Sequence, residues 1–259
     1  MRRPREALRT RGESDTTDDR GVTEVLGFIL VFATILGSVG LLYMTGFQAM
    51  SDYQENEQLT NAERAMDSLA DNFNDVARYD GVDQRYGELT LRGGTIRTGG
   101  ESTTIEINTS KTDSKEIELG SLVYESGSDT IAYEGGGVFR GNGEGSAVIK
   151  QPPIRCSGDT VVISIVKLEH DDERSVQSSD GVGLTISEVG RERQTNMSEI
   201  ESSPPTRKVT ITVVDDKPYG VGWGHALRRN GWSDAGSGEY VCKGVDRLEL
   251  QLVTAKVDY

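Results

Sequence analysis

"RGVTEVLGFILVFATILGSVGLLYMTGF", residues 20–47, decides the architecture of this chain, because the 23 residues from Val25 to Phe47 include no charged side chain. At 1.5 Å per residue such a helix is about 34 Å long, and a hydrocarbon core is about 30 Å thick. A secretory signal has a shorter apolar stretch of about 7–15 residues and then a small-residue cleavage site, which is missing here. A buried core helix would show a polar stripe. We therefore predict that residues 25–47 span a membrane.

Arginines flank this segment unequally. Residues 1–21 contain six arginines, whereas residues 48–67 contain only Arg64. The positive-inside rule then predicts a cytoplasmic N-terminus and an exterior segment 48–259. No other window approaches 18 consecutive apolar residues. We therefore expect a single-pass protein of the cell membrane.

The composition limits the function of the exterior part, which has about 210 residues and is large enough for one β-rich domain or two small ones. The chain has a net charge of −14, with 42 acidic and 28 basic residues. Nucleic-acid binding needs a basic surface, so we expect no nucleic-acid partner. The high net charge is typical of a soluble exterior part.

The helical pattern continues beyond the predicted span. Apolar side chains recur at spacings of 3, 4, 3, 4 and 3 residues and form what we call the apolar stripe: Leu59, Ala62, Met66, Leu69, Phe73 and Val76. This spacing places them on one face of a helix. Neither proline nor glycine occurs between residues 48 and 80, and Gly81 is a typical stop. We predict one helix over 22–80, whose stripe packs on the domain that follows it and not on a neighbouring chain.

From residue 87 the pattern changes to alternating β-formers separated by Gly-Gly turns. It predicts about ten short strands in an antiparallel sheet or sandwich. The predicted fold is therefore α+β: a disordered basic leader over 1–21, the long helix over 22–80 packed on the sheet, and an exterior β-rich domain over 81–259. We also expect a short helix near 224–229, and a loop over 189–206.

Several motifs have a structural and a functional interpretation. The glycine-rich "EGGGVFRGNGEG" (134–145) lacks the P-loop pattern, and "GVGWGHALRRNG" (220–231) lacks a surrounding βαβ unit, so we predict turns and core-plugging residues for both. "EHDDE" (169–173) offers carboxylates for a hard cation, but a solvated acidic turn is favoured. No G-x-S-x-G or H-E-x-x-H motif occurs, so we expect neither an enzyme nor a cofactor or metal site.

Two further features depend on the exterior location. Cys156 and Cys242 are the only cysteines, and an exterior compartment permits a disulfide, although two free thiols remain the alternative. The sequons that begin at Asn108 and Asn196 are candidates for glycosylation.

The N-terminal region resembles that of archaeal type IV pilins. A basic leader ends in Arg-Gly, an apolar helix follows at once, and "RGVTEVLGFIL" is similar to the pilin start of halophilic archaea. The motifs "EQLTNAERAMDSLADN" and "YEGGGVFR" resemble an uncharacterised haloarchaeal family with the same start. The scarcity of lysine, with 8 residues against 20 arginines, also resembles proteins of salt-loving archaea.

The resemblance implies processing by a prepilin peptidase between Gly21 and Val22, directly after Arg20. The acidic residue, Glu24, falls at position +3 of the processed chain, whereas bacterial pilins have it at +5. Many archaeal pilins have Ser-Pro where this chain has Thr23-Glu24. The Glu24 carboxylate either pairs with the new amino group of Val22 or is solvated in the headgroup zone.

The resemblance implies a membrane-held structural subunit that assembles with identical or related subunits. Close approach of helices in a membrane favours small residues, and the segment offers four: Gly27, Ala33, Gly37 and Gly40. The alternative is a permanently anchored surface protein that does not assemble and whose β domain binds a ligand or partner.

Overall fold

A computed structural model describes residues 18–90, 93–109, 114–143, 145–177, 181–194, 207–215 and 218–259. The chain divides into two compact units, Met1–Gln54 and Glu55–Tyr259. The predicted leader lies mostly outside the described residues. Helices and strands together form the α+β fold that the sequence predicts.

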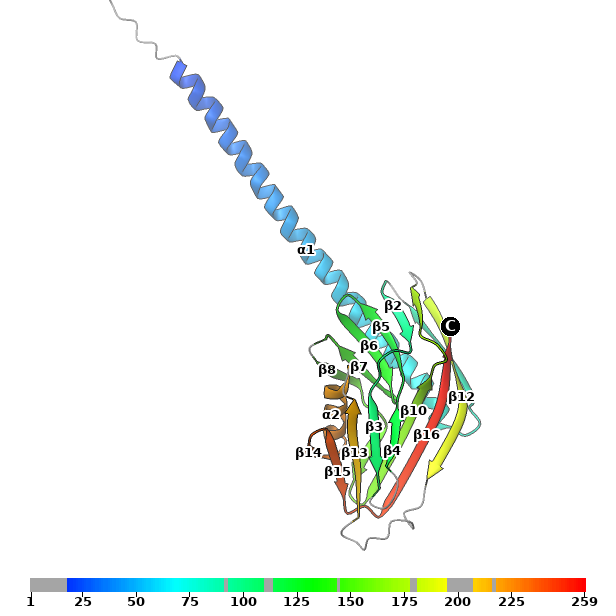
Figure 1. The fold of residues 1–259 in the computed structure, drawn as a ribbon. Helices are drawn as coiled ribbons and strands as arrows, with labels where there is room; N and C mark the ends of the chain where they lie inside the picture. Colours follow the sequence, from blue (N-terminus) through cyan, green and yellow to red (C-terminus); the bar gives the residue numbers. More distant parts are fainter. Residues whose placement is uncertain are drawn as a thin grey trace, which may run out of the picture. The chain divides into compact units, whose positions relative to one another are not determined.

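The long helix α1 (Asp18–Arg78) matches the prediction closely, since it begins before residue 22 and ends near residue 80 (Figure 1). Tyr79 N still donates to the Asp75 carbonyl at 3.0 Å. Gly81 then adopts a φ of +83°, a left-handed conformation that glycine tolerates and that commonly terminates helices. The stop signal read from the sequence is therefore confirmed.

The β-rich part contains three sheets. Sheet A has the strand order β1 (Gln84–Thr90), β12 (Gly181–Gln194), β16 (Arg247–Asp258), β10 (Thr160–Glu169) and β9 (Ile154–Ser157). Sheet B has the order β11 (Arg174–Gln177), β2 (Thr95–Thr98), β5 (Ser121–Ser126), β6 (Asp129–Glu134), β7 (Gly137–Gly141) and β8 (Ser146–Lys150). Sheet C has the order β14 (Ser233–Gly236), β15 (Glu239–Lys243), β13 (Lys208–Asp215), β3 (Thr104–Asn108) and β4 (Lys115–Glu118).

The short helix α2 (Gly220–Arg229) confirms the helix expected near 224–229. Trp223 and Leu227 of this helix are fully buried, and Trp232 just after it is nearly so. They fill the core, as the sequence predicts for this segment. The segment 134–145 also forms the predicted turn, since Gly135 and Gly136 connect β6 to β7 with positive φ angles.

Two cores lie on opposite faces of sheet B. Successive residues of β6 alternate between them: Ile131 and Tyr133 belong to the core beneath α1, whereas Ala132 belongs to the core beneath α2. We call these the α1 core and the α2 core. Sheet B is thus a middle layer, and its central strands β5, β6 and β7 are buried on both faces over most of their length.

Sheet A contains one parallel pair, β10 with β16, within an otherwise antiparallel arrangement. In each of these strands the buried side chains switch from one face of the sheet to the other between two consecutive residues. The switch occurs at the same level in both strands, where Ile165 is paired with Leu252 and Val166 with Val253. All four side chains are buried, the first pair in the α2 core and the second in the α1 core. These two strands therefore connect the two cores.

The apolar stripe packs on the β-rich part of its own chain. All six stripe residues are buried, none more than 3% exposed, and all belong to the α1 core. Phe73 meets Tyr133 edge to face at 5.4 Å between ring centroids. A side chain at Gly87 of β1 would overlap Leu69, so the glycine permits the close approach of strand and helix. The predicted intrachain packing of the stripe is confirmed.

One prediction is wrong in part. The sequence predicts a loop over 189–206, but β12 continues to Gln194 and pairs there with Leu250 of β16 (Figure 1). The polar side chains of this part of β12 are accommodated by ion pairs: Arg191 and Arg193 both pair with Asp80, which follows α1. Residues 195–206 lie outside the described residues.

Candidate functional site

The apolar half of α1 is the first candidate site. Residues Thr23–Met50 form a stretch of 28 residues that is long and apolar enough to cross a membrane, and all its side chains are exposed. Exposed Leu and Phe residues line every face of this segment: Leu36, Leu41 and Leu42, for example, point in three directions about 100–140° apart around the axis. Water would not favour such a surface, so the segment requires an apolar solvent or partner. The predicted span 25–47 lies within it.

The hydroxyl groups of Thr34, Ser38 and Thr45 in this segment are satisfied by the helix itself. The Thr34 hydroxyl donates to the Leu30 carbonyl at 2.7 Å, and Thr45 donates in the same way to Leu41 at 2.9 Å. The Ser38 hydroxyl donates to Ile35 O at 2.9 Å. Because these groups need no water, they do not oppose burial in lipid.

The four small residues do not share a single face. At 100° per residue, Ala33, Gly37 and Gly40 fall within about 60° of arc, whereas Gly27 is about 120° away from Ala33. No atom of the described chain lies within 4 Å of a Cβ placed on Gly27, Gly37 or Gly40. The face that favours close helix approach is therefore formed by Ala33, Gly37 and Gly40, and Gly27 lies outside it.

The predicted processing position lies in the first turn of α1. Arg20, Gly21 and Val22 all have helical backbone, since the helix begins at Asp18. Glu24, the seventh residue of α1, has an exposed side chain.

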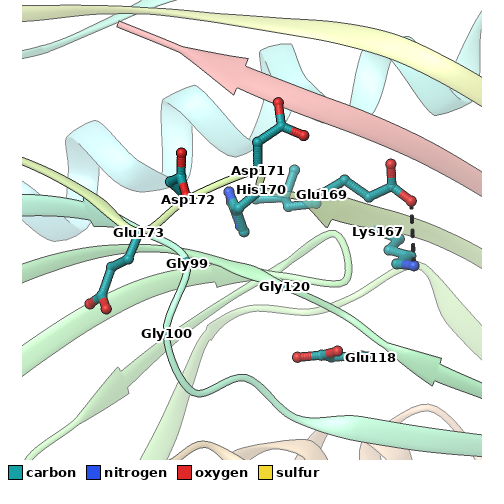
Figure 2. A pocket seen from close by; sticks show the side chains of 11 residues that line it. Gly99, Gly100, Glu118, Gly120, Lys167, Glu169, His170, Asp171, Asp172 and Glu173 are labelled. Carbon is teal, nitrogen blue, oxygen red and sulfur yellow. Dashed lines mark ion pairs between the residues drawn. The ribbon is translucent and has the colours of Figure 1, made fainter.

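A pocket of about 320 Å³ on the β-rich unit is lined by the predicted acidic turn (Figure 2). Its carboxylates point in different directions, and several are already paired. Asp171 accepts from Lys256 Nζ at 2.9 Å, and Glu173 accepts from Arg97 Nη1 at 3.1 Å. The hydrogen bond and charge of Lys256 hold the pKa of Asp171 below its usual range.

His170 lies between these carboxylates in Figure 2. Partial burial lowers the pKa of His170, and the negative charge of Glu118 opposes that effect only partly, so the neutral imidazole is favoured. Among the described residues, no group of three or more His, Cys, Asp or Glu side chains is arranged to hold a metal ion. Asp171, Asp172 and Glu173 are exposed, as the sequence predicts for an acidic turn.

Glu134, at the end of β6, is a buried acid that sequence analysis did not single out. It is fully buried, its Oε1 accepts from Trp223 Nε1 at 2.6 Å, and its Oε2 accepts from Thr103 N at 3.1 Å. Burial raises its pKa to about 7, and the hydrogen bonds from Thr103 and Trp223 oppose that increase. Strand alternation alone predicts that Glu134 and Tyr133 point to opposite faces of the sheet. It does not reveal that α2 covers the face to which Glu134 points.

A family model described as a family of unknown function, DUF7289, matches residues 20–258. The chain belongs to this family. The DUF7289 match includes the apolar half of α1, the apolar stripe and the β-rich unit. No curated protein and no solved structure matches the chain.

The remaining predicted sites of this DUF7289 chain lie on its sheets. Cys156 of β9 and Cys242 of β15 form a disulfide that joins sheet A to sheet C. Of the two alternatives, the structure therefore shows the disulfide and not two free thiols. Asn108 is exposed at the end of β3, where an attached glycan would not disturb the core. Asn196 lies outside the described residues.

Proposed function

We propose that this chain is a single-pass protein of the cell surface that acts as a pilin-like structural subunit. In this proposal α1 is held in the membrane by its apolar half and packs laterally against identical or related subunits. The cytoplasmic N-terminus and exterior β-rich unit follow from the arginine bias of the N-terminal flank.

One observation carries the proposal: a single continuous helix exposes apolar side chains on every face over 23–50 and buries only one stripe over 59–76. The first part has the surface of a membrane helix, and the second has the surface of an amphipathic helix on a soluble domain. The face formed by Ala33, Gly37 and Gly40 supports contact with another helix in the membrane, where close backbone approach drives association.

Processing by a prepilin peptidase is tested by the mass of the membrane-extracted protein. We expect the mass to lack residues 1–21 and to begin at Val22. Gly21→Trp should abolish cleavage, whereas Gly21→Ala, which keeps a small side chain, should preserve it. A protein that begins at Met1 in all three forms would contradict processing.

Assembly is tested by disulfide cross-linking in intact membranes. The described part of the chain has no free cysteine, so an introduced cysteine reports on its own surroundings. We expect Gly37→Cys to form covalent dimers on mild oxidation. The matched control is Ile35→Cys, which lies about 160° away around the helix. If neither variant forms dimers, the chain is an anchored surface protein that does not assemble.

A further inference from the structure

The α2 core contains a small group of buried polar side chains around Glu134. The described residues that supply this carboxylate with hydrogen bonds come from two other elements, Trp223 of α2 and Thr103 just before β3. No described lysine, arginine or histidine forms an ion pair with Glu134. Burying a carboxylate without a counter-charge is costly, so the free energy of this packed arrangement depends on whether Glu134 is protonated.

The surroundings suit both the ionised and the neutral carboxyl. Ser121 is the residue of β5 directly opposite Glu134 in the strand register. The Ser121 hydroxyl oxygen is buried and lacks a hydrogen-bond partner among the described residues. The Thr103 side chain lies close enough to the Glu134 carboxyl to lower its pKa, as the Thr103 N–H also does. A hydroxyl can donate to a carboxylate and can also accept from a neutral carboxylic acid. A neighbouring hydroxyl is therefore available to both protonation states of the carboxyl.

Helix α2 is weakly stable by itself. Its ten residues include three glycines, Gly220, Gly222 and Gly224, and each glycine disfavours a helix relative to alanine. Tyr219 provides no side-chain cap. A side chain at Gly222 would lie 2.8 Å from the Phe139 ring, so glycine is required for close packing against sheet B. The position of α2 consequently depends on contacts from other elements.

Few polar contacts hold α2 against sheet B. The Ser146 hydroxyl accepts from Gly222 N at 2.8 Å, the Tyr219 hydroxyl donates to Thr130 at 3.2 Å, and Trp223 donates to Glu134. Of these contacts, only the last involves a side chain that ionises below pH 9. Of the three contacts to sheet B, the Trp223–Glu134 contact is therefore the one that a change of pH can alter.

On the side of sheet C, Arg228 of α2 pairs with Asp234 of β14 at 2.7 Å. Hydrogen bonds from Gly236 and Arg228 hold the pKa of Asp234 below its usual range, so this pair keeps its charge in mild acid.

We propose that Glu134 is a proton-operated latch on α2: with the carboxyl neutral, α2 is closed over β6, and ionisation favours an open state in which Trp223 has left and the carboxylate is hydrated. Acidic conditions close the latch, and neutral to alkaline conditions loosen it.

The ionisable groups around Glu134 do not compete with it in this pH range. Tyr219, on the α2 side, has a pKa raised to about 12, chiefly by burial, and the charge of Glu134 adds to that increase. Tyr133, on the α1 side of the same strand, has a pKa raised by burial. Both tyrosines remain neutral, so Glu134 is the group at the Trp223 contact whose charge changes between pH 4.5 and 8.

The sign and size of the effect follow from linkage. The closed carboxyl titrates at about 7, and a hydrated glutamate titrates at 4.5. Because the pKa is higher in the closed state, closure is most stable below pH 4.5 and is progressively lost as the pH rises to 7. The ratio of open to closed molecules increases by at most 10 to the power 7 − 4.5, about 300-fold.

The test is amide hydrogen exchange of the full chain in detergent micelles at pH values from 4.5 to 8, corrected for intrinsic exchange rates. We expect residues 220–229 to exchange up to about 300-fold faster at the alkaline end, whereas β16 between its two neighbouring strands remains protected. Glu134→Gln, which is neutral at every pH, should abolish this dependence. A pH dependence that persists in Glu134→Gln, or is absent from the unmodified protein, would overturn the latch.

A second variant tests the latch if Glu134→Gln fails to fold. Trp223→Phe keeps an aromatic side chain but removes the donor that stabilises the ionised carboxylate. We expect the midpoint of the α2 transition to shift to higher pH, because loss of that donor raises the pKa of Glu134. An unchanged midpoint would show that the Trp223–Glu134 contact does not operate α2.

Discussion

The two halves of α1 have the same secondary structure but opposite surfaces. Over 23–50 every side chain is exposed, and most are apolar. Over 59–76 one stripe is buried, while the flanks carry acids such as Glu63, Asp67 and Asp71. Backbone geometry therefore says nothing about the solvent of a helix. The distribution of apolar side chains around the axis does, because burial follows apolar area.

The halves also satisfy their polar groups differently. Hydroxyls of the apolar half bond to the helix backbone, as Thr34 does. The stripe half relies on the β-rich unit: Arg191 donates to the Val76 carbonyl at 2.6 Å, and Gln251 donates to the Ala77 carbonyl at 2.6 Å. These bonds occupy carbonyls in the last turn, which have no partner inside the helix. The stripe half is thus fitted to one neighbour, whereas the apolar half suits a uniform solvent.

The largest expected effect on stability comes from removing Phe73 in the stripe half, with Phe32 in the apolar half as the comparison. Phe73→Ala should lower the free energy of unfolding of the β-rich unit by about 3–5 kcal/mol, because it leaves a cavity against Tyr133. Phe32→Ala, in the apolar half, should leave that free energy unchanged. Denaturant unfolding of the full chain in detergent, followed by tryptophan fluorescence, measures both. Equal losses in the two variants would remove the distinction between the halves.

A charge in the apolar half should act on insertion and not on folding. Leu36→Arg places a guanidinium near the middle of the span, at a cost of about 2.5–3.5 kcal/mol for insertion. We expect a smaller fraction of the protein to resist alkaline extraction from membranes. Glu57→Arg, on the exposed surface after the span, is the matched control and should extract like the unmodified protein. Full retention of Leu36→Arg would contradict a membrane span.

A substitution of Asn74 tests how much the buried hydrogen bonds between the stripe half and the β-rich unit contribute to stability. The Asn74 side chain donates to the Gly136 carbonyl at 2.9 Å and accepts from the Tyr133 hydroxyl at 3.0 Å. Asn74→Leu leaves both groups buried without a partner and should cost about 2 kcal/mol. Thr60→Leu, an exposed change on the same helix, should cost much less. A comparable melting temperature for the two variants would show that these bonds add nothing to docking.

The smallest effect is expected at the flank of the stripe. Lys150 of β8 pairs with Asp67 at 2.8 Å and with Asp71 at 3.0 Å, and both carboxylates are largely exposed. Lys150→Gln should therefore cost about 0.2–1 kcal/mol. The difference should vanish in about 1 M salt, where the Debye length is about 3 Å. A larger cost that persists in salt would mean that ion pairs, and not the stripe, hold α1.

The sequence alone determined the features that depend on local patterns. A long uncharged run identified the apolar half of α1, and a 3–4 spacing identified the stripe from Leu59 to Val76. Gly81 marked the helix end, and Gly-Gly pairs marked turns. These signals are readable because helix length, helix period and glycine conformation are properties of a few consecutive residues.

Only the tertiary structure decided which distant residues meet. The alternation in "TVVISIVKLE" (160–169) predicts the strand β10. It does not predict that β10 pairs in parallel with β16, or that Ile165 faces the α2 core while Val166 faces the α1 core. Two cysteines permit a disulfide, but only the packing of sheet A near sheet C brings Cys156 to Cys242. Glu134 looked like the polar start of a turn. It is buried because α2, about 90 residues later in the chain, covers the second face of its sheet, and such long-range coverage depends on the energy of the whole fold.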